Sequence, residues 1–160
     1  MAEYTAIAEQ QVAYLQPIVW TETTIPCNRG LIRHEDGSGV FTLSGSVPAQ
    51  EYQNRCCCQG TPTADYLVDF HANIAVPTGV DVGEIRLALA MDGITIPATI
   101  MKATPTVVEA YFNVGTNKNV QAFPGCCEKL SVVNATVAQT DILVSNAIID
   151  ITRPDLVMTI

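Results

Sequence analysis

Alternation of apolar and polar residues is the feature of this sequence that most restricts its fold. Between Tyr66 and Val76, one set of alternate positions is apolar, whereas the other set contains Asp69, His71 and Asn73. Successive side chains of a β-strand point to opposite faces, whereas a helix repeats about every 3.6 residues. The segment therefore predicts a half-buried strand whose buried face consists of Tyr66, Val68, Phe70, Ala72, Ile74 and Val76.

The same pattern recurs along most of the chain, and helical periodicity is nearly absent. Residues 85–91 alternate in this way, and the Asp92-Gly93 dipeptide that follows is typical of a type I′ hairpin turn into residues 94–96. A loop is expected at 115–119. The sequence predicts an all-β sandwich of about 8–10 antiparallel strands. The remaining expected strands cover residues 18–20, 31–33, 40–43, 107–114, 128–134 and 142–152.

The length and composition favour one folded domain. The chain has 160 residues, of which 48% are hydrophobic and only 15% charged, against about 25% charged in an average globular protein. We expect residues 1–17 to form an N-terminal arm or a first edge strand, and residues 18–160 to form the domain. A surface with so few charges suggests burial against partners.

The net charge excludes several classes of partner. A formal charge of −8 repels nucleic acids and anionic membranes at long range. The first residues lack the basic and apolar regions of a signal peptide, and no apolar run is long enough to span a bilayer. We therefore expect synthesis in a cytoplasm and no partner that is a nucleic acid or a membrane.

The order of these segments resembles a known fold family. Residues 39–45 and 64–79 resemble the jelly roll of the tumour necrosis factors (TNF) and the complement globular heads. Residues 85–96, 107–114 and 130–153 also resemble the C-terminal jelly rolls of bacterial exosporium glycoproteins. The whole chain is similar to small proteins encoded near structural genes in prophages of Firmicutes. The resemblance extends from Ile18 to Arg153 and is one of pattern and order.

This resemblance implies a TNF-like jelly roll that forms a homotrimer through one sheet face. The related families place a tyrosine-bearing strand in the trimer core. This sequence contains no collagen-like Gly-X-Y stalk, which makes an exosporium role less favoured, because such a stalk displays the domain there. Tyr111 and Phe112 point to opposite faces of a strand, so at least one should lie on a surface. The residues expected at the trimer interface are Tyr66, Val68, Phe70, His71, Tyr111 and Phe112.

The six cysteines leave two interpretations open, since they are either disulfide-bonded or reduced and buried as small hydrophobic residues. Bridges could join the cluster at 56–58 to the pair at 126–127, or could join protomers. Adjacent cysteines on a strand point apart, which disfavours a zinc site. The candidate disulfide residues are Cys27, Cys56, Cys57, Cys58, Cys126 and Cys127.

No pattern in the sequence predicts an enzyme or a cofactor. Ser38 lies in a segment that fails both outer positions of the Gly-x-Ser-x-Gly nucleophile motif. Asp65, Asp69, Asp81 and Glu84 lack the loop pattern of a calcium site, and we expect no metal. Asn134-Ala135-Thr136 matches the glycosylation acceptor, although the expected cytoplasmic synthesis gives it little weight.

Together with the resemblance, these observations predict a structural virion component of a bacteriophage, either a trimeric head-decoration protein or a head fibre. Its partners would be copies of itself and the major capsid protein or another virion protein, and its location would be the virion. The alternative is a trimeric adhesin-like module that binds surface glycan or a host receptor. Its binding loops would cover residues 34–39, 79–83 and 115–119.

Overall fold

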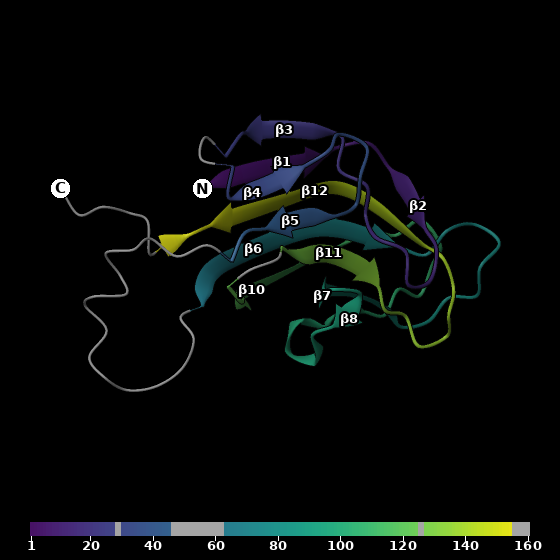
Figure 1. Ribbon diagram of the computed structural model, residues 1–160. Coiled ribbons are helices and arrows are strands. Elements are labelled where there is room, and N and C mark those ends of the chain that lie inside the picture. The colour runs from purple at the N-terminus through teal and green to yellow at the C-terminus, as the bar shows by residue number, and fades with distance from the viewer. Residues whose placement is uncertain (28–29, 46–62, 125–126, 155–160) are drawn as a thin grey trace.

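A computed structural model describes residues 1–27, 30–45, 63–124 and 127–154 as two packed antiparallel sheets (Figure 1). Sheet A has the strand order β10-β6-β12-β1-β3, with β2 also pairing with β12. Its strands are β1 (Ala2–Ala6), β2 (Gln10–Val12), β3 (Glu22–Ile25), β6 (Ala64–Ala75), β10 (Phe112–Ala122) and β12 (Ile142–Thr152).

Sheet B has the strand order β4-β5-β11-β7-β8, with β9 also pairing with β7. The 3-10 turn η1 (Pro97–Thr99) precedes β9. The described residues include no helix long and apolar enough to cross a membrane. The strands of sheet B are β4 (Ile32–His34), β5 (Phe41–Leu43), β7 (Ile85–Met91), β8 (Ile94–Thr95), β9 (Met101–Ala103) and β11 (Glu128–Asn134).

The core lies between the sheets, because each long strand turns its apolar positions inward. Trp20 is fully buried, and its ring lies 5.6 Å from that of Phe41 in sheet B and 6.2 Å from that of Phe70 in sheet A. On the neighbouring strand β1, the Tyr4 ring lies 4.7 Å from that of Phe41. These aromatic contacts join the two layers, and each is within the separation at which ring pairs attract.

Alternation located the long strands well. The strands expected at 85–91, 128–134 and 142–152 coincide with β7, β11 and β12, and the one that begins at Tyr66 is β6. The residues of the expected hairpin turn, Asp92 and Gly93, have φ angles of 50° and 82°. Both residues are therefore left-handed, as a type I′ turn requires.

The strand expected at 107–114 begins later in the chain than predicted. Residues 105–111 form an irregular segment, and β10 begins at Phe112 and continues through the residues expected to be a loop. The register explains the error, because Phe112 to Ala122 pair residue by residue with Ile74 to Ala64 of β6. A glycine and several asparagines are unfavourable in a strand, but here pairing along the whole of β6 outweighs that preference.

Within residues 1–17, β1 is neither an arm nor an edge strand, whereas β2 pairs with β12 alone. β1 lies inside sheet A, paired with β12 on one side and with β3 on the other (Figure 1). Ala2, Tyr4 and Ala6 are buried, so the segment does alternate, although two of its inward residues are small. Residues 18–20 form no strand, but Ile18 and Trp20 are both fully buried.

Candidate self-association surface

The strand β10 leaves one long side of its backbone without a partner. It pairs with β6, and no other described strand pairs with its opposite side. At 11 residues it is long for an edge strand, and it contains no proline and a single charged residue, Lys118. Such an edge presents unpaired backbone N–H and C=O groups and is a template for pairing with another chain.

Exposed apolar side chains flank this edge. Phe112 begins β10 and is 44% exposed, and Phe123, just beyond its end, is 60% exposed. Tyr111 precedes the strand and Ile94 lies on β8, the neighbouring edge of sheet B, and both are exposed. We call β10 and β8, together with Tyr111 and Phe123, the open edge. Large exposed apolar side chains at both ends of an unpaired edge favour contact with another protein surface.

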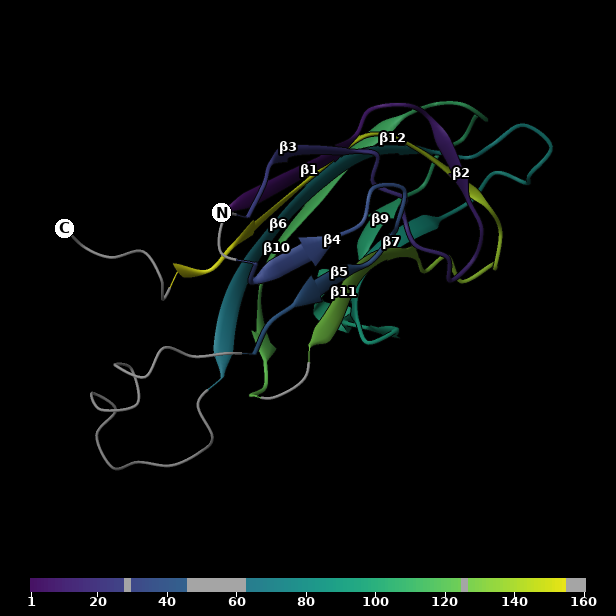
Figure 2. The ribbon, with the colours of Figure 1, turned by 45° about the horizontal axis from the view of Figure 1, so that its top comes forward.

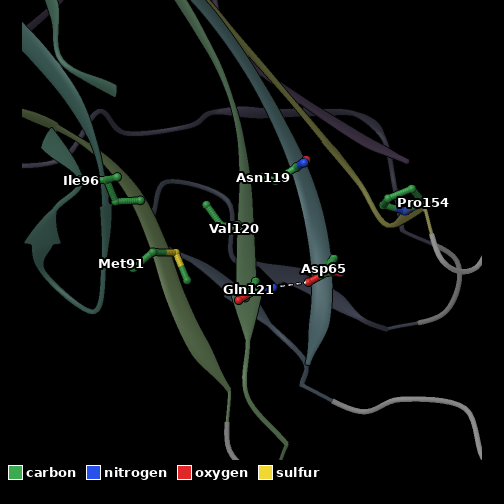
Figure 3. Close-up of a pocket in the computed structure, with 7 residues that line it drawn as sticks. All are labelled: Asp65, Met91, Ile96, Asn119, Val120, Gln121 and Pro154. Atoms are coloured by element: carbon green, nitrogen blue, oxygen red, sulfur yellow. Dashed lines mark hydrogen bonds between the residues drawn. The ribbon is translucent and has the colours of Figure 1, made fainter. Parts of the chain in front are cut away.

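A shallow pocket of about 470 Å³ lies on the open edge (Figure 3). Met91 and Ile96 line one side, and Asn119, Val120 and Gln121 of β10 line the middle. Asp65 accepts a hydrogen bond from Gln121 Nε2 at 3.0 Å, which holds β10 to β6 at this point. The pocket therefore offers an apolar depression beside a row of neutral amides, which suits another protein surface better than a charged ligand.

The outer face of β10 carries almost only amides. Asn113, Asn117, Asn119 and Gln121 lie on this face together with Gly115. Asn113 Nδ2 donates a hydrogen bond to Asn73 Oδ1 of β6 at 3.1 Å. The alternation of these amides with Val114, Val120 and Ala122 was visible in the sequence, but the glycine and asparagines at 115–119 had predicted a loop.

A row of carboxylates crosses the outer face of sheet A. Asp150 of β12 lies directly opposite Asp69 of β6 and also directly opposite Glu3 of β1. Partial burial and the charges of Glu3 and Asp69 raise the pKa of Asp150 above its ordinary value of 3.8. His71 Nε2 lies 3.1 Å from Asp69 Oδ1. Ionised carboxylates directly opposite one another repel, so protonation of Asp150 at acid pH reduces the repulsion on this face.

A second titratable contact lies where β10 begins. The Tyr111 hydroxyl donates a hydrogen bond to Glu9 Oε2. Burial of the hydroxyl, together with the negative charge of Glu9, raises the pKa of Tyr111 to about 12. Tyr111 therefore remains neutral over the physiological range and is held in one orientation at the end of the open edge.

The predicted interface residues separate into two groups. Tyr66, Val68 and Phe70 are completely buried inside one protomer, so their assignment to a trimer interface was wrong. The Tyr66 hydroxyl donates to the Ser44 carbonyl at 2.6 Å, which links sheet A to the end of β5. The error arose because the apolar side of β6 was taken for a surface between copies, whereas sheet B covers it.

The other three predicted interface residues, His71, Tyr111 and Phe112, are exposed. His71 lies on the outer face of sheet A, where its ring lies over Gly115 of β10. A Cβ at position 115 would lie 2.3 Å from His71 Nδ1, so the glycine makes room for the ring. The assignment of these three residues to an interface between copies stays a prediction.

Of the six cysteines, the structure describes two, Cys27 and Cys127. Cys56, Cys57, Cys58 and Cys126 lie outside the described residues, so the disulfides remain a prediction. Cys127 is exposed, and Cys27 is partly buried against the core. No group of three metal-ligating side chains occurs among residues 1–27, 30–45, 63–124 and 127–154.

The asparagine of the glycosylation motif serves the fold. Asn134 is fully buried. Its Nδ2 donates to the carbonyls of Val12 at 2.9 Å and Thr140 at 2.8 Å, and its Oδ1 accepts from the Thr136 amide at 3.0 Å. A buried amide with this many partners is not accessible for modification. It instead ties together three segments at one end of the sandwich.

Comparisons with solved structures find proteins of similar overall fold. The globular domain of the zebrafish complement 1qA protein matches with a TM-score of 0.62 and 13% identity, over 96% of this chain and 95% of that chain. Murine APRIL at pH 8.5 matches with a TM-score of 0.50 and 8% identity, over 93% of this chain and 98% of that chain. Neither a protein-family model nor a curated protein matches the sequence.

A sugar-binding protein, the EclA C-terminal domain, also matches, with 15% identity over 92% of this chain and 80% of that chain. Its TM-score of 0.38 is too low to support a functional argument. The first two likenesses extend over more than nine-tenths of this chain. The chain has the jelly-roll fold of the TNF and complement globular-head proteins.

Proposed function

We propose that this protein is a structural component of a bacteriophage particle that works as a homotrimer, serving as a head-decoration protein or a head fibre. The observation that carries self-association is the open edge, where the 11-residue strand β10 has no partner on one side and Phe112 is 44% exposed. Pairing or packing with a second copy would cover both features. The virion role is proposed from the resemblance, in the order of sequence segments, to small proteins encoded near structural genes in prophages.

The low charge of the chain supports a permanent assembly. Interfaces that do not dissociate are large and apolar. The exposed apolar residues of the open edge could be buried in such an interface. In a trimer with a threefold axis each protomer contacts its two neighbours through two different patches, so the open edge of one copy would pack against another surface of the next copy. In this proposal the major capsid protein, or another virion protein, contacts the trimer elsewhere.

Two measurements test this proposal. Sedimentation equilibrium should give a mass three times that of the 17.2 kDa protomer at micromolar concentration. The protein should also copurify with intact phage particles in a fixed ratio to the major capsid protein. A monomer that persists at high concentration would contradict self-association. A trimer that is absent from particles and binds a host surface would contradict the virion role and favour an adhesin.

A further inference from the structure

We propose that the outer face of sheet B binds a sugar acid, meaning a polyhydroxylated ligand with one carboxylate. The site is a pocket of about 520 Å³ at the end of β4, around the turn that joins β4 to β5, and at the start of β11, on the opposite sheet from the amides and carboxylates of sheet A. Figure 2 shows these three strands side by side, with β5 in the middle. This site is independent of the virion role proposed above.

Two cations face the same point of this pocket from its two sides. Arg33 of β4 and Lys129 of β11 both lie directly opposite Thr42 of β5, so the three residues form one row across three strands. Both cations are exposed and line the pocket. Neighbouring strands are about 4.8 Å apart, so the two long side chains can converge on one anionic group above Thr42.

These cations have no carboxylate partner among the described residues, where the ion pairs join His71 to Asp69 and Arg86 to Glu84. Arg33 uses only its Nε, which donates to the Gly30 carbonyl at 3.4 Å, so the ends of its guanidinium remain available. Guanidinium groups bind carboxylates through two parallel hydrogen bonds. The row therefore provides a carboxylate site with a charged group on either side.

The rest of the lining selects against a phosphate and for hydroxyl groups. Glu35 lines the same pocket and would repel a second negative charge, but its carboxylate can accept hydrogen bonds from ligand hydroxyls. Ser38 adds a hydroxyl, whose Oγ accepts a hydrogen bond from the Val40 amide at 3.1 Å and retains its own hydrogen to donate. The chain's charge of −8 also disfavours polyanions.

The floor of the pocket is fixed by packing. His34 Nε2 donates to the Ser38 carbonyl at 3.0 Å, which closes the turn between β4 and β5. The His34 ring stacks on Phe41 with 4.8 Å between centroids and contacts Tyr4 at 5.0 Å. Because the inward side of β4 is held in this way, the outward position of Arg33 is set before a ligand arrives.

Calorimetric titration of the intact protein with sodium glucuronate tests the site. Glucuronate should bind, whereas glucose, acetate and inorganic phosphate should bind at least about tenfold more weakly. Arg33→Gln and Lys129→Gln should each weaken glucuronate binding by roughly tenfold or more, since each removes a charge-assisted hydrogen bond. Lys102→Gln is the matched control, because it removes one exposed cation from β9 of the same sheet, outside the pocket.

Equal binding of phosphate and glucuronate would overturn the selectivity argued here. Equal weakening by Lys102→Gln would overturn the site itself, because only net charge would then matter. The absence of glucuronate binding in a correctly folded trimer would also reject the proposal and would leave self-association untouched. Circular dichroism of each variant ensures that lost binding is not lost folding.

Discussion

On one side the sandwich ends in β3 and β4, and on the other in β10 and β8. The strands β3 and β4 have 4 and 3 residues, and they carry Glu22 and Arg33. Pro26 follows β3 directly. Shortness, charge and proline are the means by which proteins protect sheet edges from pairing. The strand β10 has 11 residues, one charge and a phenylalanine at its start. In sheet A, one edge is therefore protected against pairing, and the other is open to contact with another chain.

The largest expected effect comes from placing a charge on the unprotected side. Phe112→Lys should weaken self-association by at least about 2 kcal/mol, or roughly 30-fold, because buried aromatic residues dominate interfaces. Sedimentation velocity across a concentration series measures this change. Ile25→Lys is the matched control, since Ile25 is 37% exposed on β3, and it should leave the association unchanged. Equal effects of both substitutions would remove the distinction between the two edges.

The core of the protomer provides the next test, because Tyr66 was predicted from sequence to lie between copies. Tyr66→Phe should lower the free energy of unfolding by about 1–1.5 kcal/mol, since it removes the hydroxyl that donates to the Ser44 carbonyl. Urea unfolding at fixed protein concentration measures this loss. The mass of the assembly should not change. Dissociation without loss of protomer stability would instead restore Tyr66 to the interface.

Alternation predicted this fold because it reports which face of a strand is buried, and β7, β11 and β12 needed no further information. It does not report what buries that face. For β6 the cover is sheet B of the same chain, which is why the apolar side of the strand was assigned to a trimer interface. Whether that face is buried by the same chain or by another copy depends on which strands are neighbours. The alternation pattern does not report which strands are neighbours.

The open edge was missed for a different reason. Gly115, Asn117 and Asn119 are residues that favour turns, yet register with β6 extends the strand through them. Phe112 was predicted to lie at an interface between copies, but its place at the start of an unpaired strand could not be predicted. Likewise, the row of Arg33, Thr42 and Lys129 joins residues almost a hundred positions apart, which only sheet topology brings together.

A glycine substitution on β10 should have a smaller effect. Gly115→Ala should cost about 1 kcal/mol of stability, because the new Cβ displaces His71 and approaches the Phe70 carbonyl oxygen to 3.0 Å. Gly83→Ala, where the added Cβ meets nothing within 4 Å, should be neutral or slightly stabilising. Thermal unfolding of the two variants side by side makes the comparison. Equal stability would mean that His71 does not depend on the glycine beneath it.

The smallest expected effect concerns the carboxylates of sheet A, which lie between the two edges. The pKa of Asp150 is raised in the folded protein by burial and by Glu3 and Asp69, so the folded state binds this proton more tightly than the unfolded state does. Stability should therefore fall as the pH rises from about the ordinary Asp value of 3.8 through the raised pKa.

Asp150→Asn should make this fall shallower and should raise stability at neutral pH, because it removes one of three adjacent negative charges. Urea unfolding at a series of pH values from 4 to 7 measures the slope. Asp81→Asn, in the exposed loop before β7, removes the same charge and should leave the slope unchanged. If both variants retained the slope of the unsubstituted protein, the row would be too well solvated to influence folding, and the contrast between the two sides would depend on the edges alone.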